Sequence, residues 1–212
     1  MAERIPIHTI SLGCPKNLVD TETILGALAE RFEAVESPRD AAVVLINTCG
    51  FIQPAVEESV QTILETASEL AELPRRPLLA VTGCLLARYG EELEREMPEV
   101  DVWIPLHRQR DTGNYLLQAL GRAGSGEGIR AEAPDSGAAP SRVISTGASY
   151  AYLKISEGCD RSCSFCLIPG IRGRMRSRSV ASLREEARSL LDRGVRELIL
   201  VGQDVTGENA FT

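Results

Sequence analysis

The chain has 212 residues, of which 43% are hydrophobic, 25% charged and 4% aromatic, and its formal net charge at pH 7 is −7. This is the composition of a globular protein with enough apolar side chains for a sizeable core, and the length allows one domain or two. The negative charge argues against binding nucleic acid over the whole surface, but it leaves room for a local basic site.

The sequence has no apolar run of about 18 residues and no signal-peptide core near its start, so we expect a cytoplasmic protein without a membrane span. Thiols stay reduced in the cytoplasm. The six cysteines are therefore better explained as metal or redox ligands than as three disulfides, which are the alternative.

Residues 1–120 alternate between short apolar runs and amphipathic segments. Strands are expected at residues 5–12, 41–46, 78–81 and 100–104, and helices at residues 20–32, 54–73, 85–96 and 112–120. The continuous apolar run at 41–46 is typical of a parallel strand covered on both faces. Strands that alternate with helices predict an N-terminal domain of the α/β class with a mainly parallel sheet.

Residues 121–142 are rich in glycine, alanine, serine and proline, and few of them could anchor a core, so we expect a flexible linker. A second domain follows over residues 143–212, with a strand at 149–155, a helix at 182–193 and a buried strand at 195–201. One strand–helix unit and one further strand cannot close a barrel, so this domain is expected to be incomplete.

Three cysteines of the first domain occupy equivalent places. Cys14, Cys49 and Cys84 each lie two or three residues beyond an expected strand and beside a glycine. Because ligands bind outside the carboxyl ends of strands in open α/β sheets, the three thiols could converge there. The glycines would let the backbone approach a bulky cluster. Any one of these cysteines is better explained as a small buried hydrophobe, but the threefold recurrence favours a cluster site.

The other three cysteines, Cys159, Cys163 and Cys166, have Cys-x3-Cys-x2-Cys spacing. A cubic 4Fe–4S cluster held by three cysteinates leaves one iron open to a small molecule. Structural zinc is the alternative, but it requires four ligands, and the two histidines lie in the other domain. Phe165, just before the last thiol, would shield one side of a cluster from water.

This loop, Cys-x3-Cys-x-aromatic-Cys after the first strand of a βα repeat, resembles the radical S-adenosylmethionine (SAM) enzymes. The domain with the first three cysteines is similar to the methylthiotransferase branch of that family. Residues 11–20, Ser-Leu-Gly-Cys-Pro-Lys-Asn-Leu-Val-Asp, resemble the ribosomal-protein enzymes of the branch. The tRNA-adenosine enzymes, which are the alternative, usually carry glutamine and methionine in place of Pro15 and Lys16.

The resemblance implies two 4Fe–4S clusters and the first part of a radical-SAM partial βα barrel. One cluster would be held by Cys14, Cys49 and Cys84, and the other, which binds SAM, by Cys159, Cys163 and Cys166. It also implies a 5′-deoxyadenosyl radical that abstracts hydrogen, and a first cluster that delivers methylthio to the β-carbon of an aspartate in small-subunit ribosomal protein S twelve.

Two further groups of residues are candidate contacts, the first from the resemblance and the second from the local charge. Gly202, Gln203 and Asp204 lie where family members contact SAM, although a polar turn explains them equally well. The alternating Arg172, Arg174, Arg176 and Arg178 could grip ribosomal RNA phosphates or an acidic substrate face, with a solvated loop as the alternative. The implied partners are the ribosomal protein or its subunit and an electron donor, with no membrane.

Complete members of the family continue into the rest of the barrel and a small β-barrel domain that binds substrate. We therefore expect this chain to be a fragment that has no methylthiotransferase turnover on its own. A non-catalytic iron–sulfur or zinc module is the alternative from another functional class. The edge left after Val201 is expected to promote aggregation.

Overall fold

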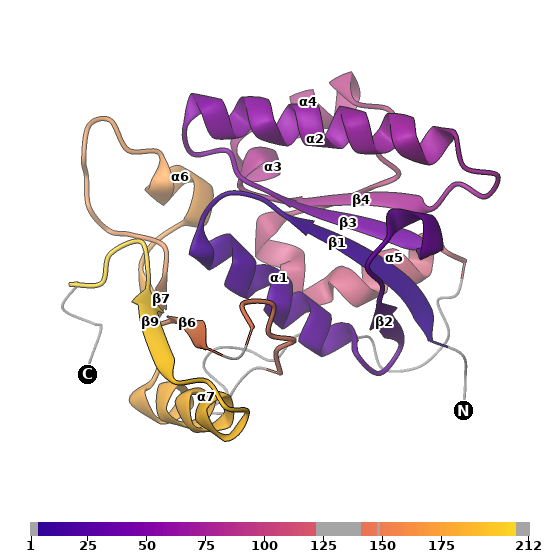
Figure 1. The fold of residues 1–212 in the computed structure, drawn as a ribbon. Helices are drawn as coiled ribbons and strands as arrows, with labels where there is room; N and C mark the ends of the chain where they lie inside the picture. The colour runs from indigo at the N-terminus through magenta and orange to yellow at the C-terminus, as the bar shows by residue number, and fades with distance from the viewer. Residues whose placement is uncertain (1–3, 122–140, 148, 207–212) are drawn as a thin grey trace.

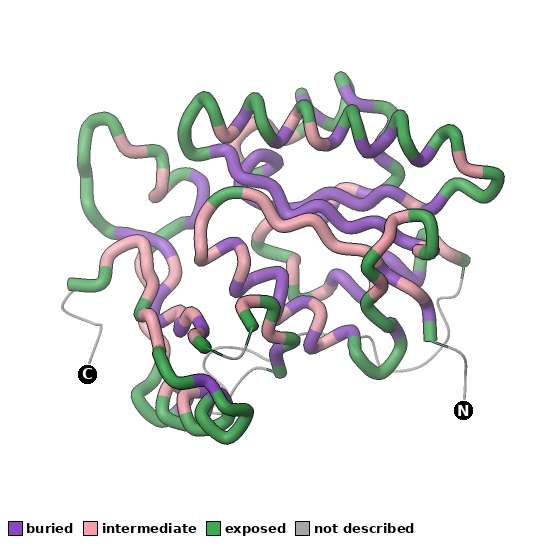
Figure 2. The backbone as a smooth tube through the Cα atoms, viewed as in Figure 1, coloured by how far each residue is buried: buried purple, intermediate pink, exposed green. Residues whose placement is uncertain are grey.

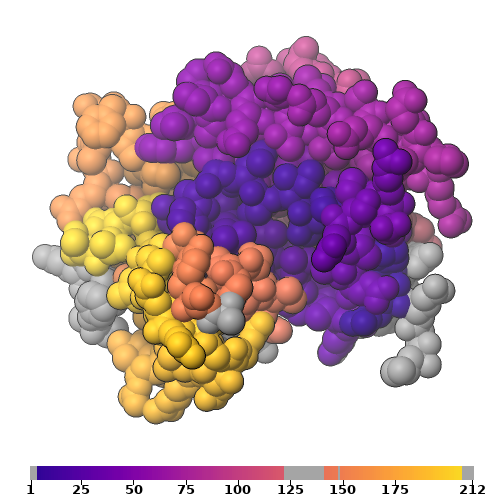
Figure 3. Space-filling model, in the orientation of Figure 1, coloured from indigo at the N-terminus to yellow at the C-terminus, as the bar shows by residue number. Residues whose placement is uncertain are grey.

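The computed structural model describes residues 4–121, 141–147 and 149–206. Figure 1 shows two parts: a parallel sheet between two layers of helices, and a smaller C-terminal part at the end of that sheet where the strands terminate. The C-terminal part packs directly against the first part (Figure 3), and its neighbours there include the helices α1 (Pro15–Leu28) and α3 (Cys84–Tyr89). The expected α/β class, with part of a second βα domain after the sheet, is confirmed.

The sheet has five strands in the order β2-β1-β3-β4-β5, and every neighbouring pair is parallel. The strands are β1 (Ile5–Ser11), β2 (Phe32–Ala34), β3 (Val43–Thr48), β4 (Leu78–Gly83) and β5 (Val102–Ile104). The helices between and after them are α1 (Pro15–Leu28), α2 (Gln53–Ala71), α3 (Cys84–Tyr89), α4 (Glu91–Glu96) and α5 (Thr112–Ala119). Short 3-10 helices span Pro38–Asp40 and Leu106–Asp111.

The central strand β3 is buried along its whole length (Figure 2) because helices cover both faces of the sheet. Side chains alternate between the faces of a strand. Val43 and Leu45 therefore join the core formed with α1 and α5, whereas Val44 and Ile46 join the core formed with α2, α3 and α4. This two-sided burial is the reason that the strand has a continuous apolar sequence.

The C-terminal part contains the parallel pair β6 (Tyr150–Lys154) and β9 (Glu197–Val201), connected through α7 (Val180–Asp192). Between β6 and α7 lie the antiparallel pair β7 (Ser156–Glu157) and β8 (Arg176–Ser177) and the short helix α6 (Ile168–Arg172). The strand predicted to be buried at 195–201 is instead largely half-exposed, because within the described residues it pairs with β6 alone.

Two expected helices differ from the structure. The helix expected at 20–32 begins earlier, at Pro15, because proline suits the first turn of a helix and its missing N–H costs nothing there. Phe32 lies in the short strand β2 instead of that helix. The segment expected to form one helix at 85–96 forms two helices, because Gly90, with φ of +55°, interrupts the helical conformation between them.

Most of the linker expected at 121–142 lies outside the described residues. Arg142 at its end is buried and ion-paired. In the part of the chain that the structure describes, no helix is both long and apolar enough to cross a membrane.

Candidate functional site

The three N-terminal cysteines lie at one edge of the sheet. The strands β1, β3 and β4 are neighbours in the sheet. A cysteine directly follows β3 and β4, and a short turn separates β1 from the third cysteine. Cys14 is the N-cap of α1, Cys49 follows β3, and Cys84 is the first residue of α3. Cys49 and Cys84 are buried, and Cys14 is partly buried.

The glycines beside these cysteines allow the three loops to approach one another. Gly13 has φ of +83°, and a Cβ there would lie 2.4 Å from Cβ of Cys49. A Cβ on Gly50 would lie 2.7 Å from the backbone of Leu85, next to Cys84. The expected reason for the glycines was close approach to a cluster, but the contacts shown here are between the cysteine loops themselves.

We expect Gly13→Ala to weaken metal binding at this edge of the sheet. The methyl group would overlap Cys49 and force it away, and the positive φ would strain the backbone at a cost of about 1–2 kcal/mol. Iron analysis after anaerobic reconstitution measures the loss. Gly121→Ala is the control, because Gly121 also has positive φ but its Cβ would meet no described atom within 4 Å. Equal iron contents in the two variants would contradict this expectation.

Two buried asparagines hold the loops in register. Nδ2 of Asn17 donates to the carbonyl of Thr48 at 2.8 Å and to that of Leu12 at 3.1 Å. Nδ2 of Asn47 donates in return to the carbonyl of Asn17 at 3.0 Å. Sequence reasoning did not assign a role to either asparagine. The available signal was the position of Asn47 in an otherwise apolar strand and of Asn17 on the inward face of a helix.

Arg172, the last residue of α6, reaches from the C-terminal part to this edge. Its Nε donates to Sγ of Cys84 at 3.2 Å, and its Nη2 donates to Oδ1 of Asn17 at 2.5 Å. The side chain is 2% exposed. The helix that follows the second cysteine set therefore brings a buried cation to a thiol of the first set.

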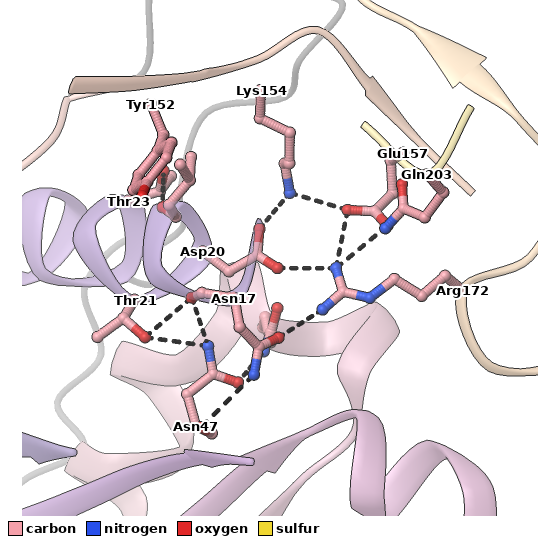
Figure 4. Close-up of polar contacts among 12 residues, drawn as sticks. Asn17, Asp20, Thr21, Thr23, Asn47, Tyr152, Lys154, Glu157, Arg172 and Gln203 are labelled. Carbon is pink, nitrogen blue, oxygen red and sulfur yellow. Dashed lines mark hydrogen bonds and ion pairs between the residues drawn. The ribbon is translucent and has the colours of Figure 1, made fainter. Parts of the chain in front are cut away.

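Arg172 is also one corner of a ring of four alternating charges (Figure 4). Its Nη1 lies 2.8 Å from Oδ2 of Asp20 and 3.1 Å from both carboxylate oxygens of Glu157. Lys154 closes the ring by pairing with Asp20 and, at 2.8 Å, with Glu157. Asp20 belongs to α1 and the other three residues to β6, β7 and α6, so the ring joins the two parts of the molecule.

The ring sets the protonation of its members and of the thiol beside it. Burial opposes ionisation of Glu157, but Lys154 and Arg172 outweigh it and hold the pKa of that carboxyl well below its usual range. Burial raises the pKa of the Cys84 thiol to about 11, against the opposing effect of Arg172. The thiol form of Cys84 is therefore favoured at neutral pH in the metal-free chain, and Arg172 is placed to stabilise a thiolate there.

The second cysteine set lies in the loop between β7 and α6. Cys159 is buried, Cys166 is partly buried and Cys163 is exposed. The backbone before this loop lies against the backbone that follows α6. A Cβ on Gly158 would lie 2.2 Å from the carbonyl oxygen of Arg174. Phe165, expected to shield this site, is 85% exposed and lies largely in solvent instead.

The turn that contains Gly202, Gln203 and Asp204 follows β9, so it lies beside this loop at the carboxyl end of the β6–β9 pair. Asp204 accepts a hydrogen bond from Nε of Arg161 at 2.8 Å. This bond, with those from Thr206, lowers the pKa of Asp204 to about 2. Nε2 of Gln203 donates to Glu157 at 3.0 Å, whereas its Oε1 is buried without a partner in the described residues.

The prediction that four alternating arginines form one stripe for RNA is wrong for Arg172, which is buried in the ring. Arg178 is also largely buried and pairs with Glu186. Buried carboxylates require paired cations, and two of the four arginines serve that need. Arg174 and Arg176 are exposed.

All six cysteines lie in the described part of the chain and are free thiols. Among the described residues, no three histidine, cysteine or acidic side chains are close enough together to hold a single metal ion. A cubic cluster separates its cysteine sulfurs more widely than a single ion does, and thiolates are its usual ligands. Both donor sets consist of thiols alone, which is the ligand type of 4Fe–4S clusters.

Two family models match this chain. The one described as "Uncharacterized protein family UPF0004" matches residues 6–105, and the Radical SAM superfamily model matches residues 153–211. The first match spans the five-stranded sheet with its three cysteines, and the second spans the other three cysteines and the turn after β9.

Curated relatives cover nearly the whole chain. The "Ribosomal protein uS12 methylthiotransferase RimO" of Nitratidesulfovibrio vulgaris (strain DP4) is 54% identical over 203 residues, which are 95% of this chain and 44% of that protein. The protein of the same name from Aquifex aeolicus (strain VF5) is 45% identical over 201 residues, 94% of this chain and 41% of that protein. The chain thus spans less than half the length of these relatives.

Solved structures share the fold at low sequence identity. The cobalamin-dependent SAM radical enzyme OxsB has a TM-score of 0.62 at 12% identity, over 97% of this chain and 35% of that one. The radical SAM methyltransferase TsrM from Kitasatospora setae has a TM-score of 0.61 at 13% identity, over 98% of this chain and 49% of that one. At such identity the likeness concerns the fold alone.

Proposed function

We propose that this chain, which resembles the uS12 branch of the radical-SAM methylthiotransferases over 95% of its length, carries the two cofactor sites of an enzyme that methylthiolates an aspartate of ribosomal protein uS12. One observation carries the proposal. Arg172, at the end of the helix that follows Cys166, lies 3.2 Å from the thiol of Cys84. The helix that follows the second thiol set therefore ends at a thiol of the first set, which suits a reaction that uses both sites.

Each set would hold one 4Fe–4S cluster through three thiolates: Cys14, Cys49 and Cys84 the first, and Cys159, Cys163 and Cys166 the second. With SAM bound at the second set, the two clusters would supply radical chemistry. Such chemistry can functionalise a C–H bond that is too weakly acidic for an ordinary base to deprotonate.

The turn after β9 would orient SAM. The buried Oε1 of Gln203 lacks a partner among the described residues, so it could accept a hydrogen bond from the amino group of SAM. Arg161 holds the ionised carboxylate of Asp204 toward the cysteine loop. Gly202 allows the turn to pack closely, since a Cβ there would lie 2.6 Å from Oγ of Ser156.

The partners follow from the relatives and from the exposed charges. Arg174 and Arg176 are the exposed members of the arginine run, so they would contact ribosomal RNA phosphates or an acidic face of uS12. A cytoplasmic location fits six reduced thiols, and an electron donor of the cell would supply the electron for SAM cleavage.

A chimera tests the substrate. The matching 203 residues of the Nitratidesulfovibrio protein are replaced by those of this chain, and the chimera is expressed in cells that lack their own methylthiotransferases. We expect mass spectrometry to find one methylthio group on an aspartate of uS12. The Cys163→Ser chimera should leave uS12 unmodified, while Ser162→Ala, a change in the same exposed loop, should not matter.

The other outcomes separate the alternatives. A chimera that methylthiolates tRNA adenosine and not uS12 would favour the tRNA branch. A chain that binds zinc in place of iron and sulfide would favour a non-catalytic module. Unmodified uS12 in the presence of a fully loaded chimera would contradict the proposed function.

A further inference from the structure

Arg172 ends the helix that follows the second cysteine set and contacts a thiol of the first. Charge neutralisation alone does not require this contact with sulfur. We propose that Arg172 is a positioning residue for the first cluster, whose reduction potential it raises by donating Nε–H to Sγ of Cys84. The inference rests on the proposed function, because it takes Cys14, Cys49 and Cys84 as the cluster ligands.

The guanidinium of Arg172 uses its nitrogens in three directions. Nε faces the sulfur of Cys84, Nη1 faces the carboxylates of Asp20 and Glu157, and Nη2 faces the amide oxygen of Asn17. A guanidinium is a planar fork with fixed donor directions, whereas a lysine ammonium is a single point charge. Lysine at this position cannot make the three sets of contacts together.

Asn17 extends the influence of Arg172 to the loops of the other two thiols. The backbone N of Asn17 donates to the carbonyl of Cys14 at 2.9 Å, and its Nδ2 donates to the carbonyl of Thr48, next to Cys49, at 2.8 Å. The side chain of Arg172 thus contacts Cys84 directly and is connected through Asn17, by two hydrogen bonds in each case, to the segments that carry Cys14 and Cys49.

The direction of the effect follows from charge. Reduction adds an electron to a cluster that three thiolates already make anionic, so a nearby cation and a hydrogen bond to sulfur favour the reduced form. The site is buried, which strengthens both interactions relative to water. Asp20 and Glu157 keep Arg172 in place, while Lys154 balances their second negative charge.

Redox titration of the full 212-residue chain tests this inference. In a background where Cys159, Cys163 and Cys166 are serine, the remaining cluster is titrated by electron paramagnetic resonance. We expect Arg172→Lys to lower its midpoint potential and Arg172→Gln to lower it further. Arg142→Gln is the matched control, because Arg142 is an equally buried arginine that also joins the two parts but is bonded to Glu22 and Glu186 and not to a thiol.

The outcomes are distinct. An unchanged potential in fully loaded Arg172 variants, or an equal shift in Arg142→Gln, would overturn the inference. If the Arg172 variants bind no cluster in this background, the same Arg172 substitutions are made in the chain with all six cysteines, and its iron content is measured. Loss confined to the first site supports the inference, and equal loss from both sites contradicts it. Failure of the unsubstituted chain to bind any cluster would refute the proposed function before any Arg172 variant is measured.

Discussion

Replacing Cys159, Cys163 and Cys166 together with serine is expected to lower the iron content of the anaerobically reconstituted chain from about eight to about four atoms. Replacing Cys14, Cys49 and Cys84 should have the same effect, because the two sets belong to separate loops at the ends of different sheets. Iron and sulfide analysis measures both losses.

The double variant Ser162→Ala and Ser164→Ala is the control for the first replacement, since it changes the same exposed loop and leaves the thiols intact. It should keep about eight irons. Retention of all the iron in either triple variant, or loss of all of it in one of them, would show that the two sets are not independent cluster sites.

The second large effect concerns stability. Arg142→Gln should lower the free energy of unfolding of the metal-free chain by about 3–5 kcal/mol, because it leaves the buried carboxylate of Glu22 without its cation and leaves Glu186 with Arg178 alone. Arg142 pairs with Glu22 of α1 and Glu186 of α7, and all three side chains are at most 3% exposed. Ser145 satisfies the other oxygen of Glu22, at 2.7 Å from both its N and its Oγ.

Urea denaturation of the same chain with Arg4→Gln gives the comparison. Arg4 pairs with Glu33 at 3.2 Å, but both side chains are about half exposed. Its loss should cost only about 0–1 kcal/mol, as is usual for surface pairs. Equal losses in the two variants would mean that the buried pairs do not hold the two parts together.

The sequence was sufficient to predict the sheet edge that carries the first thiols. Continuous apolar runs predict the buried parallel strands, and the chain direction of a parallel sheet then places the residues after each strand at one edge. Cys14, Cys49 and Cys84 follow β1, β3 and β4, as expected. The short edge strand β2 and the break at Gly90 were missed, because neither has a periodic apolar pattern long enough to register.

The charged contacts between the two parts could not be predicted. Arg172 is separated from Asp20 by 152 residues and from Asn17 by 155 residues, so no local spacing connects them. In the sequence it is one of four similar alternating arginines, and burial depends on which of them meets an acid after folding. A weak signal did exist, because Asn17 and Asp20 are polar residues on the helix face that otherwise packs inward.

The central claim is the proposal that the two cysteine sets hold two clusters close enough to interact, with the ring of Lys154, Asp20, Arg172 and Glu157 joining the parts that carry them. Electron paramagnetic resonance of the chain with both clusters reduced tests it most directly, because neighbouring paramagnetic centres broaden and split each other's signals. We predict that the spectrum of the full chain differs from the sum of the spectra of the two triple-serine variants. A spectrum equal to that sum would contradict the account.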